Sequence, residues 1–198
     1  MNHLAHLFLS EQGVEPRVGN VLGDFARGVT VQQLPIAVQA GLENHRAVDA
    51  FTDRHPEVLA GKTLFSAQRR RFAGVALDVL FDHYLLRHWH RFAQVNRQAF
   101  IQEVYRDLEA GYDLMPARMA VVMERMIAND WFTAYQDLDT IGYALDRIAG
   151  RIRFNNRFAG IIEEIRRHDD ELEAHFLAFF PDLLAFNRAR PSTVYQGH

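Results

Sequence analysis

Histidine and aspartate residues recur at intervals of four in one segment of the chain. This segment contains His45, Asp49 and Asp53, and consecutive members would lie about 40° apart on a helix, so that all three would share one face. Imidazole and carboxylate groups are ligands for Mn, Fe and Zn, and for Mg where oxygen donors predominate. The spacing therefore indicates a metal site, although a solvated polar face would show the same pattern.

A second group of candidate ligands lies in an apolar segment. Asp78 and Asp82 would share a helix face, and residues 75–77 and 79–81 around them are hydrophobic. A buried carboxylate needs a compensating partner, either a metal ion or an arginine, and both alternatives stay open. His83 would point about 100° away from Asp82 on a helix, so both serve one site only if that site lies between their directions.

The third group lies near the start of the chain. His3 and His6 would be one turn apart on a helix, and Asp24 lies in a glycine-rich segment with Arg27 close behind it. A core or capping role is the alternative for each of these residues. Consecutive helices of an antiparallel bundle could nevertheless bring all three groups together.

Helical periodicity dominates the elements that must position these residues, and no alternating strand pattern appears. We therefore predict an all-α, single-domain helical bundle over residues 1–186, followed by a loose tail over residues 187–198. The glycine-rich segment 10–28 is expected to be irregular. The predicted helices cover residues 34–53, 72–92, 99–112, 117–129, 138–152 and 156–180.

Composition limits the chemistry and the partners of the chain. It has 198 residues and no cysteine, which excludes disulfides, thiolate metal sites and cysteine nucleophiles and fits a cytoplasmic location. Neither a signal peptide nor a membrane span is expected, because no uncharged apolar run approaches the roughly 18 residues that cross a bilayer. The net charge of -3 disfavours broad nucleic-acid binding. Lys62 is the only lysine among 22 basic residues, and this arginine-rich set suits carboxylate and phosphate recognition or simply reflects genomic composition.

Four motifs, taken together and in order, resemble those of the acyl-carrier-protein phosphodiesterases, an unusual branch of the HD-type metal-dependent phosphohydrolases. The motifs are MNHLAHLFL, GNVLGDFARG, ENHRAVDAFTDRHP and LDVLFDHYLLRHW. The resemblance implies an HD-domain-like helical fold and a divalent cation, Mn²⁺ or Mg²⁺. It also implies removal of 4′-phosphopantetheine from the serine of holo acyl carrier protein, which leaves the apo protein.

The resemblance places the family pattern on particular residues, although their roles stay open because the Asp82–His83 pair reverses the usual His–Asp order of HD proteins. The opening His6 also matches the family, whereas His3 is a less secure match. The matching positions elsewhere are Asp24, His45, Arg46, Asp49, Asp53, Asp78, Asp82 and His83.

We expect a mechanism in which one or two cations activate water and neutralise phosphoryl oxygens. His83 is the candidate acid for the leaving serine oxygen, with His6 second. Arg46 and Arg27 are expected to bind the nonbridging phosphate oxygens. The expected metal ligands are Asp24, His45, Asp49, Asp78 and Asp82.

An acidic carrier protein would dock on positive surface near the site. The candidates are Arg69, Arg70 and Arg71 and, further along, Arg87 or Arg91. A solvated charged face is the alternative for the arginine run. The rival functions are an HD-type phosphohydrolase acting on a nucleotide or another small phosphoester, and a noncatalytic helical protein that binds metal or a partner. The sequence leaves the oligomeric state undetermined.

Overall fold

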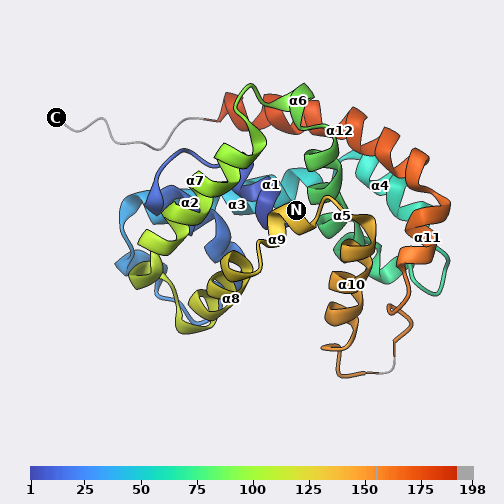
Figure 1. The fold of residues 1–198 in the computed structure, drawn as a ribbon, viewed down its shortest axis with the longest axis horizontal. Helices are drawn as coiled ribbons and strands as arrows, with labels where there is room; N and C mark the ends of the chain where they lie inside the picture. Colours follow the sequence, from blue (N-terminus) through green and yellow to red (C-terminus); the bar gives the residue numbers. More distant parts are fainter. Residues whose placement is uncertain (155, 191–198) are drawn as a thin grey trace.

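The computed structural model describes residues 1–154 and 156–190, and these residues form α-helices and short 3₁₀ turns with no β-strand (Figure 1). This confirms the prediction of an all-α domain. None of the described helices is long and apolar enough to cross a membrane. The helices are α1 (His3–Phe8), α2 (Val14–Leu22), α3 (Ile36–Thr52), α4 (Pro56–Thr63), α5 (Ala73–Arg87), α6 (Trp89–Phe92), α7 (Arg97–Ala110), α8 (Ala117–Ala128), α9 (Trp131–Ala134), α10 (Leu138–Ala149), α11 (Ile162–Arg167) and α12 (Asp169–Ala189).

Helix α5 lies in the middle of the molecule, where α1, α4, α10 and α12 all pack against it (Figure 1). Its sequence explains this position, because the apolar run around Leu77, Leu80 and Leu85 leaves few polar side chains to face water. Within α5 only Gly74, Val75, Asp78 and Arg87 are partly or fully exposed. The helix therefore brings Asp78 to the surface and buries Asp82 one turn further on.

The segment expected to be irregular contains a helix. Helix α2 covers Val14–Leu22 within the glycine-rich stretch 10–28. Pro16 lies in its first turn, where the missing backbone N–H has no intrahelical partner to lose. The prediction gave too much weight to the helix-breaking tendency of glycine and proline, and packing against α3 outweighs that tendency.

Two glycines explain how closely α2 and α3 pack. A Cβ atom built on Gly19 would lie 2.2 Å from the carbonyl oxygen of Val38, and one built on Gly41 would lie 2.3 Å from that of Pro16. No side chain fits in either place. This close crossing of the backbones holds α2, and the 3₁₀ turn η1 (Gly23–Phe25) that follows it, beside His45 of α3.

The predicted helix over residues 156–180 is two helices, α11 and α12, which are separated at His168. Helix α12 continues through Pro181 to Ala189, beyond the predicted end. Burial of Phe176, Phe180 and Leu183 on both sides of the proline favours the continuous helix over a break. Residues 191–198 of the predicted tail lie outside the described residues.

We predict that Gly41→Ala destabilises the protein by about 1–3 kcal/mol, because the added methyl group would push α3 away from the backbone of α2. Thermal and urea unfolding monitored by circular dichroism would measure the loss. Gly74→Ala in α5 is the matched control, since its Cβ atom would lie 3.6 Å from Lys62, an ordinary contact. Equal stability of the two variants would contradict the close helix crossing.

Candidate metal centre

Two helices bring His6, His45 and Asp49 together. His6 comes from α1 and the other two residues come from α3, and one ligand atom from each lies within 4.8 Å of the others. Asp78 of α5 is linked to this group because the Met1 ammonium forms ion pairs with both Asp49 and Asp78. The structure therefore joins members of all three sequence groups around one point. We call His6, His45 and Asp49 the metal-ligand cluster.

The contacts of His45 indicate a missing positive charge. Its Nδ1 atom lies 2.7 Å from the carbonyl oxygen of Asn20; because a carbonyl only accepts hydrogen bonds, Nδ1 must carry the proton. In a neutral ring Nε2 then presents a lone pair, and this atom lies 3.0 Å from Oδ2 of Asp49. Two acceptors face each other at this distance only if the ring is doubly protonated or a cation lies with them. A backbone carbonyl that orients a ligating imidazole is a common feature of metal sites.

His6 supplies a second imidazole that is free to coordinate. The ring is fully buried and stacks on His45 with a centroid distance of 3.8 Å. Its Nε2 atom lies 3.1 Å from Oδ1 of Asp49, yet neither ring nitrogen forms a hydrogen bond within the described part of the chain. Burial lowers the pKa of His6 to about 4, so the ring is neutral at pH 7. The sequence analysis assigned His6 to proton transfer, whereas its position suits a ligand.

The ammonium group of Met1 shows how strongly this region attracts positive charge. Its nitrogen lies 3.0 Å from Oδ1 of Asp49 and 3.0 Å from Oδ1 of Asp78. Burial acts to lower the pKa of the ammonium, but the two carboxylates outweigh burial and raise this pKa to about 10. Burial raises the pKa of the Asp78 carboxyl, because it disfavours the charged form. Burial would also raise the pKa of Asp49, but its close contacts with the imidazoles of His45 and His6 and the nearby Met1 ammonium lower it.

Asp24 and His3 form a pair at the more exposed edge of the metal-ligand cluster. Nδ1 of His3 lies 3.2 Å from Oδ2 of Asp24, and the imidazole stacks against Phe25. Burial acts to raise the pKa of Asp24, but the hydrogen bond and the charge of His3 outweigh it and lower this pKa. The predicted ligand Asp24 is thus close to the cluster while having its own imidazole partner.

Asp82 holds α1 in place, and its contacts do not support the predicted role as a metal ligand. The carboxylate is fully buried. Its Oδ2 atom accepts hydrogen bonds from the Leu4 amide at 3.1 Å and the Asn2 side chain at 2.9 Å, and its Oδ1 atom accepts one from the Ala5 amide at 2.9 Å. The side chain of the N-cap residue Asn2 accepts no hydrogen bond from the amides of α1, so Asp82 satisfies the first amides of that helix from α5.

His83, the predicted acid, makes its contacts outside the metal-ligand cluster. Its Nδ1 atom lies 2.8 Å from the carbonyl oxygen of Tyr135, and its Nε2 atom lies 3.0 Å from Nη2 of Arg87. Burial lowers the pKa of His83. The physical reason is the one-residue offset from Asp82, which turns the ring toward α9 and the following loop.

Gly23 is a residue of the site that the sequence analysis did not single out. A Cβ atom on Gly23 would lie 2.1 Å from Cδ2 of His45, so only glycine leaves room for the imidazole. The signal available in the sequence is its position directly before Asp24 in GNVLGDFARG.

Most of the arginines predicted to bind a partner have internal contacts. Arg71 differs, because it stacks on Phe72 and Phe154 and has no carboxylate partner among the described residues. Three of the five candidate docking arginines thus stabilise the fold. Arg69 pairs with Glu164, Arg70 donates to the carbonyls of Thr63 and Phe65, and Arg87 pairs with Asp169 and Glu173.

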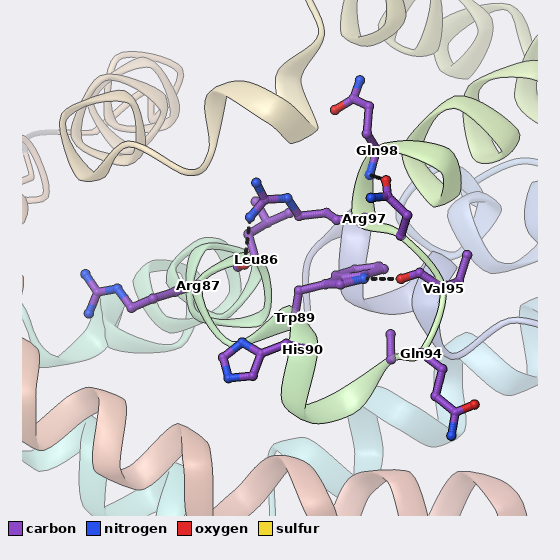
Figure 2. A pocket seen from close by; sticks show the side chains of 10 residues that line it. Leu86, Arg87, Trp89, His90, Gln94, Val95, Arg97 and Gln98 are labelled. Atoms are coloured by element: carbon purple, nitrogen blue, oxygen red, sulfur yellow. Dashed lines mark hydrogen bonds between the residues drawn. The ribbon is translucent and has the colours of Figure 1, made fainter.

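A pocket of about 420 Å³ lies at the C-terminal end of α5 (Figure 2). Its walls are held by two hydrogen bonds, from Trp89 to the carbonyl of Val95 and from Arg97 to that of Leu86. None of its lining residues belongs to the cluster. The pocket and the candidate metal centre are therefore separate features.

Comparison with known proteins shows one family along almost the whole chain. Residues 1–183 match the family model described as acyl carrier protein phosphodiesterase. Proteins of that name from Serratia proteamaculans and Yersinia pestis are each 34% identical over 185 residues, which cover 93% of this chain and 96% of theirs. One from Escherichia coli is 32% identical over 186 residues, with the same coverage. No solved structure gives a significant match.

We expect Asp49→Asn to weaken Mn²⁺ binding by at least the roughly 10–100-fold that is typical for the loss of a supporting group at a metal site. The amide removes the negative charge that faces both imidazoles while keeping the size of the side chain. Isothermal titration calorimetry would measure the change. Glu43→Gln, an exposed carboxylate on the same helix, is the control; equal affinities for the two variants would argue against the site.

For Asp82→Asn we predict a stability loss of about 1–3 kcal/mol, because the amide group would turn a donor toward the backbone amides of α1. Unfolding by heat and urea would measure this loss. Mn²⁺ titration of the folded variant should still reach the wild-type stoichiometry. Unchanged stability combined with lost metal would instead make Asp82 a ligand.

Proposed function

The chain belongs to the acyl carrier protein phosphodiesterase family, and we propose that it hydrolyses holo acyl carrier protein to the apo protein and 4′-phosphopantetheine. The single observation that carries this proposal is that ligand atoms of His6, His45 and Asp49 converge on one point where a cation could bind. The names of the curated relatives do not favour the rival functions, a nucleotide phosphohydrolase or a noncatalytic binding protein.

We propose that the cofactor is one or two divalent cations held by His6, His45 and Asp49, with Asp24 and Asp78 as the proposed further ligands. The unpaired nitrogens of His6 and the lone pair of His45 support this fit. Imidazole donors suit Mn²⁺ better than Mg²⁺, which prefers oxygen ligands. The relationship to HD-type phosphohydrolases stays a prediction.

When bound, the cation would supply water activation and would neutralise charge on the phosphoryl group. In the overall step a water oxygen bonds to phosphorus, the bond from phosphorus to the serine oxygen breaks, and the serine oxygen takes up a proton. Phosphopantetheine leaves as a phosphate monoester. The chain must therefore orient the phosphodiester and deliver one proton.

We propose that three residues near the exposed edge of the cluster carry out these two tasks. We assign the proton to His3, which replaces His83 in this role because its ring lies beside the cluster with Asp24 as its partner. Arg27 follows Asp24 by three residues and Arg46 follows His45 directly, and both are exposed. Their guanidinium groups are proposed to bind the nonbridging phosphate oxygens.

Incubation of holo acyl carrier protein with the purified protein and Mn²⁺ should remove the phosphopantetheine group, as measured by intact-protein mass spectrometry. A chelator should stop the loss, and added Mn²⁺ should restore it. Apo carrier protein should stay unchanged as the control. An unaltered holo protein, together with hydrolysis of a nucleotide panel, would support the rival phosphohydrolase.

A further inference from the structure

The exposed part of α5 forms a strip that leads away from the metal-ligand cluster. Asp78 and Val75 lie on it, and Arg71 follows in the 3₁₀ turn η3 (Arg70–Phe72) just before the helix. Seven residues separate Asp78 from Arg71, which corresponds to about 10 Å of helix. A molecule placed over the cluster would therefore also cover this strip.

Arg71 presents a positive charge without a neutralising partner. Its guanidinium carbon lies 4.5 Å from the ring centre of Phe72 and 4.7 Å from that of Phe154. No carboxylate within the described residues pairs with it, whereas Arg69 and Arg87 are both neutralised. Stacking between two rings holds the planar group in place and leaves its N–H donors available.

The surroundings of Arg71 combine positive charge with exposed apolar groups. Phe154 is 56% exposed and Val75 is 41% exposed. Arg153 and Arg157 are also exposed, and neither forms an ion pair in the described part of the chain. Arginine and aromatic side chains are enriched at protein interfaces, so this mixture differs from a merely solvated charged face.

We propose that Arg71, Val75, Arg153 and Phe154 form a docking surface for the acidic face of the carrier protein beside its modified serine. This inference rests on the proposed function. The scissile phosphodiester is attached directly to the serine, so the carrier protein surface must approach the rim of the cluster while the pantetheine arm extends elsewhere. Acidic side chains of the carrier protein would pair with the free guanidinium groups, and its apolar side chains would cover Phe154 and Val75.

Steady-state cleavage of holo carrier protein in the presence of Mn²⁺ tests the docking surface. We expect Arg71→Glu to raise KM by roughly tenfold or more and Phe154→Ala by roughly fivefold, with kcat nearly unchanged. Binding of apo carrier protein, which lacks the arm, should weaken by similar factors in calorimetry. Circular dichroism should show wild-type folding, and Phe154→Ala keeps the test decisive if Arg71→Glu is unstable.

Arg118→Glu is the control with the same change of charge. Arg118 is exposed on α8, which lies on the opposite side of the molecule from α10 and α11 (Figure 1). Unchanged KM in both surface variants, with active wild-type protein, would overturn the docking surface and leave the proposed function standing. An equal rise in KM for Arg118→Glu would also overturn it, because only net charge would then matter. Wild-type protein that leaves holo carrier protein intact would overturn the proposed function itself, and this inference with it.

Discussion

The candidate site depends on one buried carboxylate that joins two helices. Asp82 accepts hydrogen bonds from the first amides of α1 and from Asn2. Helix α1 has only six residues, too few to be stable without tertiary contacts. This anchor fixes the direction in which α1 presents His3 and His6. His6 reaches Asp49 of α3, and His3 reaches Asp24 of η1, because α5 holds the helix that carries both imidazoles.

Around this anchor, the cluster concentrates groups that accept positive charge. Nδ1 of His45 is committed to the Asn20 carbonyl, and His6 is kept neutral by burial. The carboxylate of Asp49 faces the Nε2 atoms of both stacked rings and also contacts the Met1 ammonium. Such an arrangement is unfavourable for a buried region unless a cation completes it. The same excess of acceptors is what would hold the proposed divalent cation.

The arginines divide into two groups with different physical roles. Arg17 and Arg69 are satisfied by carboxylates, so they join helices that are distant in sequence. Arg46, next to His45 on α3, and Arg71, just before α5, are exposed and have no carboxylate partner among the described residues. Charge that is already neutralised inside the fold contributes little to recognition, whereas free guanidinium groups remain available to phosphate and to an acidic protein.

The sequence by itself determined the helical class, the boundaries of α3 to within two residues, and the common face of His45 and Asp49. These features follow from local periodicity, which a helix of any environment obeys. Only the tertiary structure separated Asp78 from Asp82, which the same periodicity places on one face. Helix α1 covers Asp82 and leaves Asp78 partly exposed. The physical reason is that the role of each side chain depends on the backbone amides and charges opposite it. These come from distant parts of the chain, so the spacing of residues in the sequence does not encode them.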